Sequence, residues 1–223
     1  MYILLRIIFT AAEFFGMLLL SLSTFRIYFR YSLHKVALIA VVMASTSVYI
    51  RDTLDLVSYS LLPVITTEVI LITVLFGLPL IFSFLISIIG MLATAMFETL
   101  VLAIGSYFHL FTQDTMKTSL TQFIVHELIN TATLLLVTYP IQKYKLGFHT
   151  TSNDALKAYN FWLAAILVIA IFGIQISIVS FRGSTVHILL PIALCGILLI
   201  GVYLAYQHNR KLWKNRRERL SKR

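Results

Sequence analysis

Long apolar runs separated by short polar segments make up most of the sequence. A helix needs about 20 mostly apolar residues to cross roughly 30 Å of hydrocarbon at about 1.5 Å per residue, and several runs reach that length. They predict an all-α fold, a polytopic membrane bundle of about seven transmembrane helices. The predicted spans are residues 3–25, 36–50, 56–76, 79–106, 119–139, 159–181 and 186–206, of which the second is short.

One apolar stretch, residues 56–111, is too long for a single crossing. Gly77, Leu78 and Pro79 form the strong break near its middle, because glycine and proline interrupt helices. A tight helical hairpin at this break is the simplest interpretation. A re-entrant segment is the alternative, since nonhelical backbone is tolerated at membrane depth where protein or water covers it.

Basic residues in the connecting segments predict the orientation, because cytoplasmic loops carry an excess of lysine and arginine. With the N-terminus outside, the outer side receives only Arg6, Arg51, Lys117 and Arg182. The inner side receives Arg26, Arg30, Lys35, Lys143, Lys145, Lys157 and eight basic residues from Arg210 to Arg223. We therefore expect a multi-pass protein of the cell membrane, N-out/C-in, with a helical domain at 1–206 and a basic cytoplasmic tail at 207–223.

The composition supports this assignment and excludes several classes of protein. Hydrophobic residues make up 59% of the chain and charged residues 12%, whereas about 25% are charged in a soluble domain. The net charge of +9 does not indicate a nucleic-acid partner, because the basic residues lie between apolar runs. The single cysteine, Cys195, allows no disulfide framework and no multi-cysteine metal site, and we expect neither a metal nor a cofactor.

Small residues at helical spacing predict where helices pack closely, since packing of small residues holds membrane helices together. They are Ala37, Ala40, Ala44 and Ser47 in the second span, Ser83, Ser87, Gly90 and Thr94 in the fourth, and Gly173 and Ser177 in the sixth.

Ionisable residues at membrane depth are the candidate functional residues, because each costs about 2.5–3.5 kcal/mol at the bilayer centre and usually faces the bundle interior. Glu13 and Glu68 lie near the middle of the first and third spans. Glu98 lies in the outer half of the fourth span, and His126 and Glu127 lie in the outer half of the fifth. At 1.5 Å per residue, Glu98 and Glu127 are both roughly 10–12 Å deep, so they could meet.

Neither lysine nor arginine occupies these deep positions, so we expect some of the acids to carry a proton. His126 is the one deep residue that could supply a positive charge, and Asn130, one turn later on the same face, could hydrogen-bond it or a ligand. Two interpretations remain open. In the first, the acids are neutral groups that join helices. In the second, they line an outward-facing polar cavity that binds a cationic or amide-rich ligand or relays protons.

Three further features lie at the membrane surfaces. Arg51, Asp52 and Asp55 form a charged group at the outer rim, for which a local ion pair is the simplest account. Residues 107–119 form the longest outer polar segment and the best candidate for a ligand-contacting loop. The tail is expected to bind anionic headgroups at about 1 kcal/mol per basic residue, or to pair with a partner helix. Its contact residues would be Arg210, Lys211, Trp213, Lys214, Arg216, Arg217 and Arg219.

Known catalytic motifs do not fit. His126 and Glu127 resemble the start of an HExxH zinc site, but position 130 is asparagine. His126 and Asn130 share the HxxxN spacing of CAAX-type intramembrane proteases, whose paired-glutamate motif is absent from the sequence. We therefore predict that the chain is not an enzyme.

The arrangement resembles the membrane sensor half of the Agr-type peptide-sensing (GHKL) histidine kinases of Gram-positive bacteria. The resemblance rests on seven apolar spans, the N-out topology, a last helix that continues into a basic segment, and three stretches of sequence. Those stretches are Glu13 to Phe15 followed by residues 17–22, then Phe25 with Arg26, and residues 49–53. The dimerisation helix and kinase domain of that family are missing, which implies that signal output would come from a partner.

The leading hypothesis is a bacterial sensor-like or accessory membrane protein that binds an extracellular ligand or peptide and couples to a partner such as a kinase or a transporter subunit. The alternative is a small proton- or cation-coupled transporter or channel subunit that uses Glu68, Glu98, His126 and Glu127. A purely structural assembly factor is a third class.

Overall fold

The computed structural model describes residues 2–27, 30–53, 60–108, 110–112, 115–116 and 119–144. Within these ranges the chain forms helices and no β-strand, which confirms the predicted all-α class. The main helices are α1 (Tyr2–Thr24), α2 (Leu33–Val48), α3 (Leu61–Phe76), α4 (Leu80–Tyr107) and α6 (Leu120–Lys143). A short 3₁₀ turn, Arg30–Ser32, precedes α2, and a π-helical turn, Tyr49–Thr53, extends it. The predicted sixth and seventh spans and the basic tail lie outside the described residues.

Four of these helices are long and apolar enough to cross a membrane: Tyr2–Thr24, Leu33–Asp52, Leu80–Tyr107 and Leu120–Lys143. Their length and composition are those of a membrane protein. Helix α3 has 16 residues, so it extends only about 24 Å.

Two predicted boundaries need correction. The second span is not short, because α2 begins at Leu33 and the π-helical turn continues it to a 20-residue span. The fifth span was expected to end at Tyr139, before Pro140, but α6 continues to Lys143. Proline removes only one intrahelical hydrogen bond, and membrane helices tolerate that loss.

Residues 77–79 form a tight turn between α3 and α4, which confirms the predicted helical hairpin. Gly77 ends α3 in the left-handed conformation, with φ 64° and ψ 30°, which glycine adopts without a steric penalty. Pro79 precedes α4, and its carbonyl oxygen accepts hydrogen bonds from the backbone N–H groups of Phe82 and Ser83.

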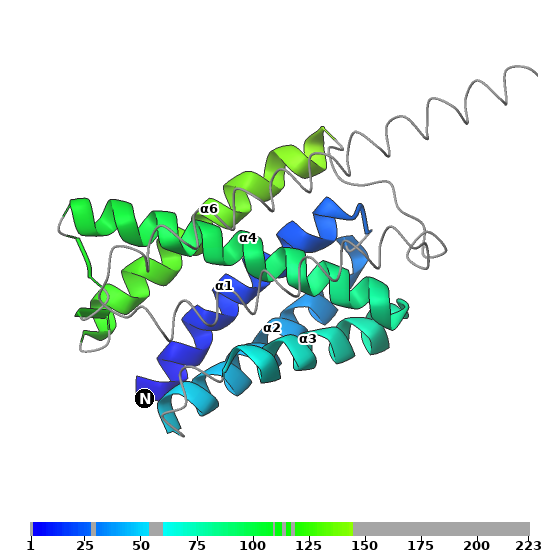
Figure 1. Ribbon diagram of the computed structural model, residues 1–223, viewed down its shortest axis with the longest axis horizontal. Helices are drawn as coiled ribbons and strands as arrows, with labels where there is room; N and C mark the ends of the chain where they lie inside the picture. The colour runs from blue at the N-terminus through cyan, green and yellow to red at the C-terminus, as the bar shows by residue number, and fades with distance from the viewer. Residues whose placement is uncertain are drawn as a thin grey trace, which may run out of the picture.

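Helix α1 lies in the middle of the described bundle and packs against α6, α2 and α4, while α3 packs against α2 and α4 (Figure 1). Polar contacts at the helix ends fix their relative directions. At the end where α1 begins, which we call the Arg6 end, Arg6 forms a 3.0 Å salt bridge with Asp52 after α2. At the opposite end, the Lys35 end, the Lys35 ammonium donates a 2.8 Å hydrogen bond to the carbonyl oxygen of Leu75, in the last turn of α3.

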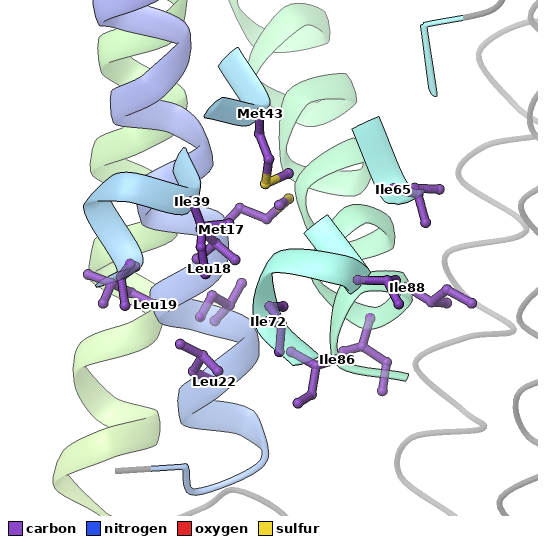
Figure 2. Packing of buried hydrophobic residues seen from close by; sticks show 14 of the residues in the cluster. Met17, Leu18, Leu19, Leu22, Ile39, Met43, Ile65, Ile72, Ile86 and Ile88 are labelled. Atoms are coloured by element: carbon purple, nitrogen blue, oxygen red, sulfur yellow. The ribbon is translucent and has the colours of Figure 1, made fainter. Parts of the chain in front are cut away.

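The apolar core lies where α1, α2, α3 and α4 meet (Figure 2). The side chains of Met17 and Met43 point toward one another there, next to Ile39. Lipid tails are as apolar as these side chains, so close packing and not the expulsion of water favours this arrangement within a bilayer.

Glycines allow the closest helix approaches. A Cβ atom added to Gly90 of α4 would lie 3.0 Å from the Cβ of Ser21 in α1, whereas one added to Gly16 would lie 3.4 Å from the Cβ of Leu134 in α6. All four small residues predicted on the fourth span are buried. In the second span Ala40, Ala44 and Ser47 are buried but Ala37 is exposed, so the packed stripe is one turn shorter than predicted.

We predict that Gly90→Ala destabilises the bundle, because the new methyl group must push α1 and α4 apart. A loss of about 1–3 kcal/mol is the usual cost of overpacking. Thermal unfolding of the purified protein in detergent would measure it. Gly16→Ala is the matched control, since its methyl group makes an ordinary van der Waals contact, and equal effects of the two substitutions would contradict the prediction.

Candidate functional site

The centre of the site is a hydrogen bond between α1 and α6. Asn130 donates from Nδ2 to Oε1 of Glu13 over 2.5 Å, and both side chains are buried. Glu13 lies at the midpoint of α1, about 16 Å from either helix end. Because lipid offers no hydrogen-bonding partners at that depth, the carboxyl group has to be satisfied from within the bundle.

Two more acids approach this pair. Glu127 lies on α6 one turn nearer the Arg6 end, and its carboxyl group interacts electrostatically with that of Glu13. Glu98 of α4 interacts electrostatically with both. We call Glu13, Glu98, Glu127 and Asn130 the carboxyl cluster.

The members of the carboxyl cluster differ in exposure. Glu13, Glu127 and Asn130 are buried, whereas Glu98 is exposed. The cluster thus extends from the surface of α4 to the interface between α1 and α6.

His126 lies beside the carboxyl cluster. The sequence allowed a hydrogen bond between His126 and Asn130, but the structure does not contain it. Asn130 is committed to Glu13 instead. The imidazole is buried and interacts electrostatically with Glu127, and its Nε2 has no hydrogen-bond partner among the described residues.

Phe111 covers His126, a contact that the sequence did not reveal. The two rings meet edge to face, with centroids 5.4 Å apart and an interplanar angle of 85°. After α4 the chain turns back, with the Leu110 N–H donating to the Gly105 carbonyl oxygen over 2.9 Å. The ring lies so close against Gly105 that a Cβ atom there would overlap it. Phe111 therefore packs onto the bundle, whereas Leu110 beside it is exposed.

Arg51 and Asp52, which were predicted to form one charged group at the outer rim, interact with different residues. Asp52 pairs with Arg6, whose guanidinium also lies 4.6 Å from the centre of the Phe123 ring. Arg51 is exposed and interacts electrostatically with Glu127. Asp55 lies outside the described residues, as do the headgroup-binding candidates of the tail.

Glu68 stands apart from the other acids. It is fully buried on α3, and its interactions within the described bundle include Ser87 of α4 but none of the other acids. The single intramembrane group expected from the sequence is therefore two separate groups.

The carboxyl cluster leaves acceptor atoms available. Oε2 of Glu127 and Oδ1 of Asn130 are buried and have no hydrogen-bond partner among the described residues. Such atoms can accept hydrogen bonds from an ammonium or amide group. No set of three or more histidine, cysteine, aspartate or glutamate side chains in the described part of the chain has the geometry to hold a metal ion.

Comparison with models of protein families finds no match, and comparisons with curated proteins and with solved structures find none either. The resemblance to Agr-type sensors therefore stays a prediction.

We predict that Asn130→Leu destabilises the bundle by about 1–2 kcal/mol, because it leaves the buried Glu13 carboxyl group without its amide donor. Glu13→Gln should cost less, since the new amide oxygen can accept the same hydrogen bond. Thermal unfolding in detergent would compare the two variants. A larger loss for Glu13→Gln than for Asn130→Leu would show that the bond does not join α1 to α6.

Proposed function

We propose that this chain is a multi-pass protein of the bacterial cell membrane, with seven spanning helices and the N-terminus outside, that binds a ligand at the carboxyl cluster and signals to a partner protein. The observation that carries the proposal is the set of buried acceptors on Glu127 and Asn130, which have no hydrogen-bond partner among the described residues. An ionisable residue at membrane depth is by default a functional-site hypothesis, and a buried polar group without a partner needs a physical explanation such as a ligand.

The chemistry of the carboxyl cluster favours a cationic or amide-rich ligand, such as a short peptide. Three carboxyl groups approach one another there, and the basic residues that act on them in the described part of the chain are His126 and Arg51, both on Glu127. A ligand that carries an ammonium group or several N–H donors would neutralise the acids and satisfy the open acceptors.

The position of the carboxyl cluster favours entry from the Arg6 end. Glu127 lies seven residues after the start of α6, at a depth of about 10 Å. Arg51 and Phe111 lie on the same side of the cluster, so a ligand that enters there meets them first. In the orientation proposed from the basic residues, this side faces out of the cell.

The output would pass through the tail, residues 207–223. Its basic residues are suited to anionic headgroups, and Leu212, Trp213 and Leu220 are suited to a partner helix. The resemblance to Agr-type sensors supports a separate protein, such as a kinase, as the partner.

A proton- or cation-coupled transporter is the second candidate, and the exposed Glu98 favours it. A carboxyl group at the surface that acts on two buried ones is a possible first step of a proton relay. Proteoliposomes that contain a pH-sensitive dye would separate the two functions. Proton flux that disappears in the Glu98→Gln, Glu127→Gln double variant would replace the sensor proposal with transport.

We predict that the Arg6 end of the bundle is accessible from outside the cell and the Lys35 end is not. In a Cys195→Ser background, Leu110→Cys and His34→Cys each place one thiol at an exposed position at the respective ends. A membrane-impermeant maleimide should label only Leu110→Cys in intact cells, and both variants after the cells are broken. Labelling of only His34→Cys in intact cells would reverse the proposed orientation.

We predict that the protein purified in nanodiscs carries an organic cation or peptide that the Glu13→Gln, Glu127→Gln double variant loses. Mass spectrometry of solvent extracts would measure the bound molecule per mole of protein. Glu68→Gln is the matched control, because it removes a buried carboxyl group outside the cluster. An equal loss in this control, or a wild-type extract no richer than that of the double variant, would refute the proposal.

A further inference from the structure

Glu68 is the most fully buried acid in the described bundle. Its side chain has no exposed surface, and its neighbours on the same face of α3 are the core residues Val64, Ile65, Val69 and Ile72. Neither carboxyl oxygen makes a hydrogen bond to a described residue. An acid in such surroundings is unfavourable unless another group satisfies it.

The hydroxyl groups of Ser83 and Ser87, near Glu68, do not bond their own helix as most other hydroxyl groups of the described bundle do. Eight serine and threonine hydroxyls donate to the carbonyl oxygen four residues earlier in their own helix: Ser23, Thr24, Ser45, Thr46, Thr66, Thr99, Thr133 and Thr138. Membrane helices commonly satisfy hydroxyls in this way. Ser83 and Ser87 are fully buried and make no such bond to any described residue, so their oxygen atoms are available to another partner.

The hairpin places Ser87 at the level of Glu68 and Ser83 about one helical turn nearer the loop of the hairpin. Counted from Leu78 in the turn, Glu68 lies ten residues back and Ser87 nine residues forward, so they face each other across α3 and α4. Ser87 interacts with the Glu68 carboxyl group, although the hydroxyl does not meet the geometry of a hydrogen bond. Ser83 lies one turn from Ser87 on the same face of α4 and is level with Thr73, another buried hydroxyl that has no partner among the described residues.

We propose that Glu68, Ser87 and Ser83 form an occluded binding site for a monovalent alkali cation, represented by Na⁺, between α3 and α4. Oxygen atoms are the ligands that hard cations prefer, and the carboxylate and hydroxyls supply only oxygen. One carboxylate balances one positive charge, so the occupied site is neutral in its apolar surroundings. A divalent ion would leave an excess positive charge that no other acid beside Glu68 offsets in the described bundle.

The site differs from the carboxyl cluster in what it can select. The cluster offers several acids and an amide at the interface of α1 and α6, which suits an organic ligand with several donors. The Glu68 site offers one charge inside a closed core and suits a small ion. It is independent of the proposed function, since a cation at Glu68 can stabilise the α3–α4 hairpin whether or not a ligand binds elsewhere.

Labelling with a hydrophobic carbodiimide tests the proposal, because the reagent enters the membrane and adds to a protonated carboxyl group. The purified protein is compared in NaCl and in choline chloride of equal ionic strength, and Glu68 is identified by peptide mass spectrometry with Glu68→Gln as the blank. Na⁺ should slow the labelling of Glu68 by about tenfold at a concentration ten times its Kd, by mass action. Labelling of the exposed Glu98 should be unaffected by Na⁺.

A second measurement tests the proposal even if the site is too closed for the carbodiimide to enter. NaCl should raise the unfolding temperature relative to choline chloride, and Ser87→Ala should weaken that rise. Ser45→Ala is the matched control, since its exposed hydroxyl bonds its own helix. Identical labelling and identical unfolding temperatures in the two salts would overturn the proposal. Protection by Mg²⁺ or Ca²⁺ but not by Na⁺ would overturn its monovalent character.

Discussion

A bilayer interior cannot hydrogen-bond a polar side chain, and this constraint organises the bundle. Glu13 lies at the midpoint of the first helix, so its carboxyl group needs a donor from a helix that crosses at the same depth. Asn130 of α6 is that donor. The bond makes α1 and α6 neighbours, and α2 and α4 pack on the remaining sides of α1 (Figure 1). One polar contact therefore selects the central helix of the described bundle.

The two acidic regions satisfy that constraint in different ways. Around Glu13, the acids interact electrostatically with one another, Glu13 accepts a hydrogen bond from an amide, and the group extends to the exposed Glu98. Around Glu68, the surroundings are apolar, and the nearby hydroxyls are not bonded to their own helix. A region that connects with the surface suits exchange of a ligand, whereas a closed region suits an ion that stays bound while the helices remain together.

Hydropathy along the chain predicts helices and depths, because both follow from residue number. The helices of the described residues and the turn at 77–79 were accessible in this way. The side-by-side arrangement of the helices could not be predicted in this way, since the order of the helices in the sequence does not say which of their faces meet. The sequence allowed Asn130 to hydrogen-bond His126, on its own helix, or a ligand, and in the structure its amide donates to Glu13. Likewise, the contact of Phe111 with Gly105 and His126 could not be predicted from the sequence, because it depends on α6 packing beside the end of α4.

The partners in the central hydrogen bond are 117 residues apart, and that separation has a consequence for biogenesis. At about 5–20 residues per second, the ribosome adds Asn130 roughly 6–23 seconds after Glu13. During that interval the carboxyl group of Glu13 in the newly inserted first helix lacks the hydrogen bond that the Asn130 amide later donates. The nascent chain must therefore hold that acid protonated, beside water or against the insertion machinery. Helices α2, α3 and α4 emerge during the delay, and the order of assembly is set by translation as well as by packing.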